Sequence, residues 1–162
     1  AGAAMDVAGP IEDRAYFEEC MAAAKDTDVQ YVGQLQGAAL TALVRGASAA
    51  VVTPMWDEPF GLVAAEALAS GVPVVAFDRG AMREVVGSCG ILVAPGDTDA
   101  LGAAIGGVGV VDRDACRQRA MGRFSTAAMI KGYEGAYSSA VSGSDDTSAL
   151  ASSCSRTTEL LA

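Results

Sequence analysis

The chain has 162 residues and is 51% hydrophobic, which suffices for one domain with one core. Twenty acidic and eleven basic residues give a net charge of −9, which argues against binding nucleic acid or an anionic membrane through bulk charge. The sequence has no histidine, which excludes imidazole metal sites and Ser-His-Asp or Cys-His catalysis, and no apolar run approaches the roughly 18 residues of a membrane span.

Short apolar runs alternate with helical patterns along the chain. Strands are expected at 6–8, 29–32, 49–53, 73–77 and 91–93. Helices are expected at 13–25, 36–46, 61–70, 81–86, 97–106, 112–122 and 125–139. This alternation predicts an α/β fold with a parallel sheet. Residues 1–140 are expected to form one domain, and residues 141–162 a Ser/Thr-rich low-complexity tail.

Two carboxylates, Glu58 and Glu66, lie eight positions apart across a predicted strand-to-helix turn. Ligands of open α/β sheets bind outside the carboxyl ends of the strands, where a helix that begins there offers free N–H groups to a phosphate. Glu66 falls in an apolar stretch of the helix, so its carboxylate needs donors such as ribose hydroxyls. On spacing alone, two surface glutamates that only favour the helix dipole are an equal alternative.

A longer set of motifs surrounds these glutamates. In chain order it reads Glu58-Pro-Phe-Gly-Leu, Ala67-Leu-Ala-Ser-Gly-Val-Pro-Val-Val-Ala, Arg79-Gly80, Glu84-Val-Val, Gly90-Ile-Leu-Val and Pro95-Gly-Asp. In order and spacing the motifs resemble the carboxyl-terminal domain of group 1 (family 4-like) retaining glycosyltransferases, over about residues 7–137. The resemblance implies a Rossmann-like parallel sheet with helices on both faces, which is the carboxyl-terminal half of a GT-B fold.

The resemblance also implies roles for the residues around the turn. Glu58, as the catalytic candidate, would hydrogen-bond the hydroxyls of the donor sugar, and Glu66 would hold the ribose. The donor would be a UDP-, GDP- or ADP-linked sugar, with no metal and no further cofactor. The sugar and diphosphate would face backbone N–H groups at the start of the helix, from Phe60, Gly61, Leu62 and Val63.

Four further donor-binding candidates follow predicted strands. Backbone groups of Gly33 and Gln34 would contact the base, although any strand-to-helix turn favours glycine. Arg79 and Gly80 follow the fourth strand, where Arg79 would reach a phosphate or form a surface ion pair. Trp56 is expected to be a hydrophobic plug beneath the loop rather than a platform for stacking a sugar.

The Arg and Lys that clamp the diphosphate in the resembled family have no counterpart before Met5. They follow a first strand that would lie at the centre of the sheet, between the strands at 6–8 and 49–53. The amino-terminal acceptor domain is also expected to be missing. Unpaired ladder groups each cost about 1–3 kcal/mol, so we expect a marginally stable chain that self-associates through the incomplete sheet or closes the gap differently.

The sequence therefore predicts the donor-binding half of a cytoplasmic glycosyltransferase that transfers a sugar with retention of configuration. The isolated chain is expected to be inactive. Two alternatives stay open. One is a non-catalytic nucleotide-binding or assembly fragment, which the missing Arg and Lys favour. The other is a sugar-nucleotide epimerase of the same two-domain fold, although such enzymes usually rely on a histidine that this chain lacks.

Overall fold

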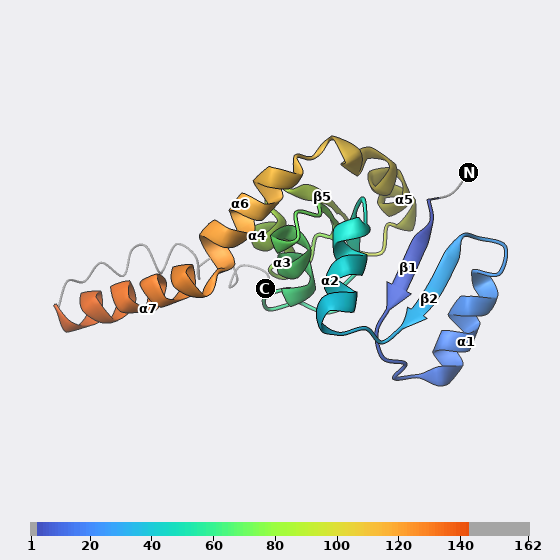
Figure 1. Ribbon diagram of the computed structural model, residues 1–162, viewed down its shortest axis with the longest axis horizontal. Helices are drawn as coiled ribbons and strands as arrows, with labels where there is room; N and C mark the ends of the chain where they lie inside the picture. The colour runs from blue at the N-terminus through green and yellow to red at the C-terminus, as the bar shows by residue number, and fades with distance from the viewer. Residues whose placement is uncertain (1–2, 143–162) are drawn as a thin grey trace, which may run out of the picture. The chain divides into compact units, whose positions relative to one another are not determined.

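A computed structural model describes residues 3–142 of the chain (Figure 1). The chain divides into two compact units, residues 1–120 and 121–162. The strands are β1 (Met5–Ala8), β2 (Val29–Gly33), β3 (Ala50–Val52), β4 (Val74–Phe77) and β5 (Gly90–Val93). The helices of the first unit are α1 (Arg14–Ala23), α2 (Gly37–Gly46), α3 (Leu62–Ala69), α4 (Met82–Val86) and α5 (Thr98–Gly107), with a 3-10 turn, η1 (Val108–Val110).

Helix α6 (Arg113–Phe124) runs from the first unit into the second, which contains α7 (Thr126–Val141). Every predicted strand and helix is present, with each end within two residues of its expected position. Turn η1 was not predicted. The expected tail at 141–162 lies outside the described residues except for its first two positions.

The strands form two separate parallel sheets. One has the order β1-β2 and the other the order β3-β4-β5. The first pairs Met5 with Val29, and the second aligns Ala50, Val74 and Gly90 across its three strands. Among residues 3–142, no strand pairs with the free edges of β1 and β3. The ladder is therefore interrupted where the sequence predicts a gap, between β1 and β3.

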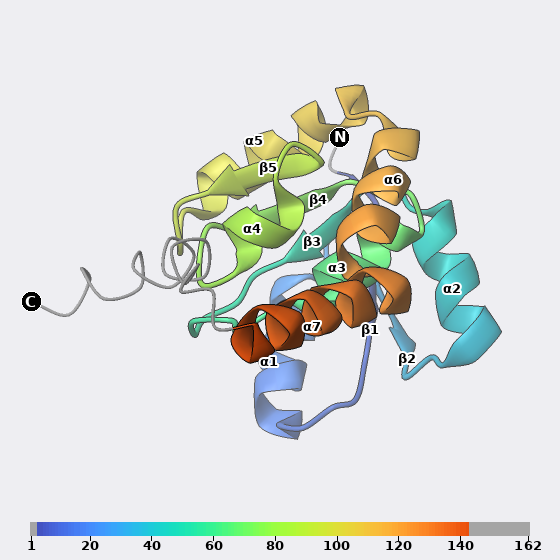
Figure 2. The same cartoon turned by 90° about the vertical axis from the view of Figure 1, so that its left-hand side faces the viewer.

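The core surrounds β4, whose four residues are all buried. Val75 packs with Ala104 of α5 and Val108 of η1. Helices α3 and α4 also contact β4, and Figure 2 shows them on the side of the sheet opposite α5. Because a strand buried on both faces needs apolar side chains in both directions, the uninterrupted run Val-Val-Ala-Phe suits this central position.

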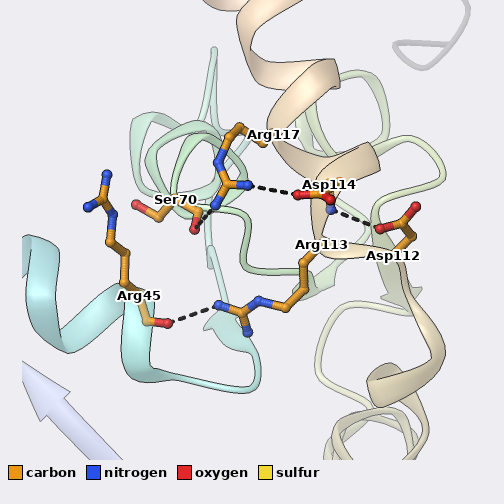
Figure 3. A network of polar contacts seen from close by, with 6 residues as sticks. All are labelled: Arg45, Ser70, Asp112, Arg113, Asp114 and Arg117. Carbon is orange, nitrogen blue, oxygen red and sulfur yellow. Dashed lines mark hydrogen bonds and ion pairs between the residues drawn. The ribbon is translucent and has the colours of Figure 1, made fainter.

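Arginines of α6 bind the carboxyl ends of helices that precede it in the chain. The guanidinium of Arg113 donates to the carbonyl oxygens of Ala47 (2.8 Å) and Arg45 (2.9 Å), at the end of α2. The guanidinium of Arg117 donates to the carbonyl oxygen of Ser70 (3.3 Å), which follows α3 (Figure 3). The last carbonyls of a helix lack partners within the helix and carry partial negative charge, so cations stabilise them.

Helix α4 is capped in the same way by Arg119, whose Nε donates to the carbonyl oxygen of Val85 at 2.8 Å. The guanidinium also binds the carbonyl oxygen of Glu84. Glycines leave room for two of these arginines. A Cβ added at Gly71 would lie 2.6 Å from the guanidinium of Arg117, and a Cβ added at Gly87 would lie 2.4 Å from the guanidinium of Arg119. Three helix ends are thus fixed by one helix, and the opposite end of α3 is held at the carboxyl edge of the sheet.

Candidate functional site

Two loops meet at the carboxyl ends of neighbouring strands. Residues 53–61 follow β3 and residues 78–81 follow β4, and the two strands are parallel, so both loops lie at the same edge of the sheet. The N–H of Ala81 donates to the carbonyl oxygen of Glu58 (2.8 Å). Nε of Arg79 donates to Oδ1 of Asp57 (3.0 Å). A backbone hydrogen bond and an ion pair therefore tie the two loops together.

The Glu58 side chain is half-buried and bonded within its own loop. Its Oε1 accepts the N–H of Gly61 (3.0 Å), the residue that caps the amino end of α3. Gly61 has φ of +87°, and a Cβ there would lie 2.1 Å from Cε of Met82. The left-handed backbone favours glycine, and a side chain there would have to displace the flexible end of Met82. This anchoring fixes the carboxylate beside the first turn of α3, where unpaired N–H groups face outward.

Glu66 lies on the exposed face of α3. Leu62 and Val63 share this exposure, at 67% and 62%, whereas Ala64 and Leu68 on the other face are fully buried. The expectation that Glu66 sits in apolar, desolvated surroundings was therefore wrong. The apolar residues near it in sequence point to the opposite side of the helix or are themselves in solvent. Its carboxylate is accessible to a ligand without any burial cost.

The aromatic residues of the first loop are also accessible. Phe60 is 40% exposed and Trp56 is 62% exposed. The interpretation of Trp56 as a plug beneath the loop was wrong, because the plugging contact under Gly61 comes from Met82. Sequence reasoning missed Asp57 and Met82 as residues that shape the site. The charges of Asp57 and Arg79 were visible in the sequence, but nothing there paired them across 22 positions.

Gly33 and Gln34 lie at the end of the other sheet. Gly33 has φ of +82° and its carbonyl oxygen accepts the N–H of Gly9 (3.1 Å), which joins the ends of β1 and β2. The hydroxyl of Tyr31 donates to the carbonyl oxygen of Gly9 (2.7 Å). Gln34 is exposed. The structure thus brings together Glu58, Gly61, Arg79 and Gly80, whereas Gly33 and Gln34 belong to a sheet with no ladder to that cluster.

Within residues 3–142, no group of three or more His, Cys, Asp or Glu side chains could hold a metal ion. In the same part of the chain, no helix combines the length and apolar character needed to cross a membrane.

This chain is similar in sequence and fold to known proteins. A family model described as "Glycosyl transferases group 1" matches residues 2–108. Glycogen synthase of Mycobacterium tuberculosis is 44% identical over 92 residues, which are 56% of this chain and 22% of that protein. This chain therefore spans about a fifth of the length of that relative.

Solved structures agree with the sequence matches. The crystal structure of AviGT4, a glycosyltransferase involved in avilamycin A biosynthesis, superimposes with a TM-score of 0.73 at 25% identity, over 87% of this chain and 44% of that one. The pneumococcal O-GlcNAc transferase GtfA, solved with UDP and GlcNAc, shares the fold with a TM-score of 0.62 at 21% identity, over 82% of this chain and 28% of that one. On the family match and the α/β architecture, the chain belongs to the group 1 glycosyl transferases.

Proposed function

We propose that this chain is the donor-binding part of a glycosyltransferase that transfers a sugar from a nucleotide sugar with retention of configuration. The observation that carries the proposal is the anchored Glu58 carboxylate, which lies beside the amino end of α3 with Glu66 on the exposed face of the same helix. A helix amino end suits a diphosphate, and two carboxylates suit the hydroxyls of a sugar and of a ribose.

Glu58 is suited to binding a sugar because its two oxygens have different environments. Oε1 accepts the N–H of Gly61, and Oε2 has no partner among residues 3–142. The bound oxygen fixes the side chain, so the free oxygen can accept a hydroxyl with little loss of side-chain entropy. In this proposal Glu58 orients the donor sugar and stabilises charge that develops near its ring.

The diphosphate would lie against the first turn of α3. The N–H groups of Leu62 and Val63 lack acceptors within the helix, as in any first turn, and the helix dipole adds positive potential. Phe60 and Gly61 shape the entry to this turn. Glu66, about one turn further along, would accept the two ribose hydroxyls. Because this arrangement neutralises the leaving group without a cation, we propose metal-independent chemistry.

Three of the remaining predicted residues, Gly33, Gln34 and Arg79, would take supporting roles in donor binding. The backbone at Gly33 and Gln34 would contact the base. Arg79, now paired with Asp57, would exchange this exposed ion pair for a phosphate at little cost, because such pairs contribute about 0–1 kcal/mol. The acceptor would bind a separate amino-terminal domain. We place the protein in the cytoplasm, where the free thiols of Cys89 and Cys116 would stay reduced.

A second candidate is a non-catalytic module that assembles with another copy or another protein. The free edges of β1 and β3 favour it, because exposed strand edges readily pair with other chains. In that case the unfolding midpoint and the apparent mass would rise with protein concentration, and no nucleotide would bind.

Calorimetric titration of the chain with UDP, GDP and ADP tests the proposal. We expect one of the three to bind, and Glu66→Ala to weaken it by about tenfold or more through the loss of two hydrogen bonds to a carboxylate. Glu19→Ala, which removes an exposed glutamate of α1, is the matched control and should bind like the parent. A folded chain that binds none of the three nucleotides would contradict the proposal.

A further inference from the structure

The turn between β4 and α4 presses against the backbone of the loop that carries Glu58. Gly80 has φ of +59°, and a Cβ added there would lie 2.4 Å from both the amide nitrogen and the carbonyl oxygen of Glu58. It would also lie 2.9 Å from the carbonyl carbon of Asp57. These are backbone atoms, which cannot rotate aside as a flexible side chain would. A side chain at position 80 would therefore have to displace Glu58 itself.

The neighbours of Gly80 hold the same loop. Arg79 binds the Asp57 carboxylate, Ala81 donates its N–H to the carbonyl oxygen of Glu58, and Met82 fills the space beside Gly61. The four consecutive residues 79–82 thus contact three residues of the Glu58 loop, Asp57, Glu58 and Gly61. The hydrogen bond from the N–H of Gly61 to Oε1 of Glu58 lies within the segment 57–61 that these residues contact. Any shift of the Glu58 backbone therefore moves its carboxylate relative to the start of α3.

We infer that Gly80 is a positioning residue for the Glu58 carboxylate, rather than a residue that contacts the donor. The effect of Gly80 on sugar binding rests on the proposed function, whereas its effect on the position of Glu58 does not. Absence of a side chain at position 80 lets the β4–α4 turn approach the Glu58 backbone. That approach sets where the free oxygen of Glu58 meets a sugar hydroxyl.

Gly96 offers a matched control for Gly80. It also has a positive φ, +82°, but a Cβ added there would meet nothing within 4 Å. Gly80→Ala and Gly96→Ala therefore both place alanine in a left-handed conformation, and only Gly80→Ala pushes on Glu58. Any difference between the two variants that exceeds their shared backbone strain reports the contact with Glu58.

Amide hydrogen exchange of the ligand-free protein tests the structural part. We expect the Gly61 and Ala81 amides, which donate to Glu58, to exchange about tenfold or more faster in Gly80→Ala than in the parent chain, as loss of a hydrogen bond implies. Gly96→Ala should leave both amides unchanged. Unchanged exchange at Gly61 in Gly80→Ala would overturn the inference whether or not any nucleotide binds.

Affinity for a nucleotide sugar tests the functional part. We compare the affinity for each nucleotide with the affinity for its sugar conjugate. The pairs are UDP and UDP-glucose, GDP and GDP-mannose, and ADP and ADP-glucose, and the ratio within a pair gives the contribution of the sugar. We expect Gly80→Ala to bind the preferred nucleotide within about twofold of the parent but to lose the contribution of the sugar, while Gly96→Ala keeps both. Equal loss of nucleotide and nucleotide sugar in a folded Gly80→Ala, or no difference from Gly96→Ala, would overturn the inference.

If Gly80→Ala does not fold, Ala81→Pro takes its place. The φ of Ala81 is −77°, which suits proline, and the substitution removes the N–H that binds the carbonyl oxygen of Glu58. The same faster exchange at Gly61 and the same selective loss of the sugar contribution are expected. Failure of the parent chain to bind any nucleotide would contradict the proposed function and leave the exchange measurement to decide the role of Gly80.

Discussion

Two regions of the molecule differ sharply in how they are held together. The two-strand region, residues 5–33, contains β1, α1 and β2, and none of its residues is buried. The three-strand region, residues 50–120, contains β3 to β5 with α3 to α5 and the start of α6, and includes every buried residue described. The two loops that hold the Glu58 carboxylate, after β3 and after β4, therefore belong to the region that contains the core.

The difference follows from the position of each strand. Strand β4 has a strand on both sides and helices on both faces, so all four residues leave solvent. Among residues 3–142, β1 pairs only with β2, and Phe17 of α1 makes an edge-to-face contact with Tyr31 of β2, with ring centroids 4.9 Å apart. A two-stranded sheet is marginal in water. The two-strand region should therefore open more easily than the rest of the first unit.

Paired valine substitutions should give the largest contrast. Val75→Ala removes two methyl groups from a fully buried site and is expected to lower the free energy of unfolding by about 2–3 kcal/mol. Val7→Ala acts on a side chain that is 42% exposed, and it should change the free energy of unfolding by no more than about 0.5 kcal/mol. Denaturant unfolding measures both. Equal effects would show that the two regions share one cooperative core.

Thiol labelling compares the regions without mutation. Cys20 is exposed, whereas Cys89 and Cys116 are buried. Burial raises the pKa of the Cys116 thiol to about 12, with a further contribution from Cys89, so little reactive thiolate exists at pH 8. We expect Cys20 to react about 100-fold faster or more, because the buried thiols react only after local opening. Peptide mapping separates the sites, and similar rates at Cys20 and Cys116 would contradict the comparison.

Arginine substitutions test the capping of helices by α6. Arg119→Met keeps the apolar stem but removes the bonds to the carbonyl oxygens at the end of α4, and should lower stability by about 1–3 kcal/mol. Arg14→Met removes only an exposed pair with Glu18 at 4.0 Å and should cost less than about 0.5 kcal/mol. If thermal unfolding shows the same shift for both variants, the capping by Arg119 contributes nothing specific.

The smallest contrast comes from two equivalent helix caps. Asp97 accepts the N–H of Ala100 (2.9 Å) at α5, and Asp13 accepts the N–H of Tyr16 (3.0 Å) at α1. Substitution of either by alanine should cost its helix about 1 kcal/mol. We expect Asp97→Ala to lower the global free energy of unfolding and Asp13→Ala to change only amide exchange within α1. A global loss in Asp13→Ala would mean that the two regions unfold together.

The sequence predicted the elements well because each has its own local signals. Asp13 and Asp97 cap helices, Gly71 ends α3, and apolar runs mark the strands. The interruption of the sheet was also predictable. The resembled fold has a central strand between the strands at 6–8 and 49–53, and the order of the motifs indicated that residues 3–142 contain no counterpart of it. The family was predictable for the same reason, since the spacing of the motifs around Glu58 is specific.

Other features depend on contacts that sequence patterns do not encode. The expectation that Glu66 has apolar, desolvated surroundings was wrong because Glu66 is exposed and its apolar neighbours Leu62 and Val63 are exposed too. The spacing of small residues along α3 does not reveal this exposure. Arg113 caps α2 through the carbonyl oxygens of Ala47 and Arg45, which precede it in the chain by 66 and 68 positions. The space that Gly80 leaves for Glu58 is likewise a distance between loops of different strands. Each required the tertiary structure.

The most direct test of the donor site is a two-dimensional amide NMR titration of the chain with UDP, GDP and ADP in turn. The account predicts that one nucleotide shifts the amides of Gly61, Leu62, Val63 and Glu66 in a saturable way, and that Glu66→Ala abolishes the shifts. Saturable shifts confined to other parts of the chain, or no shift with any of the three nucleotides in a folded protein, would contradict it.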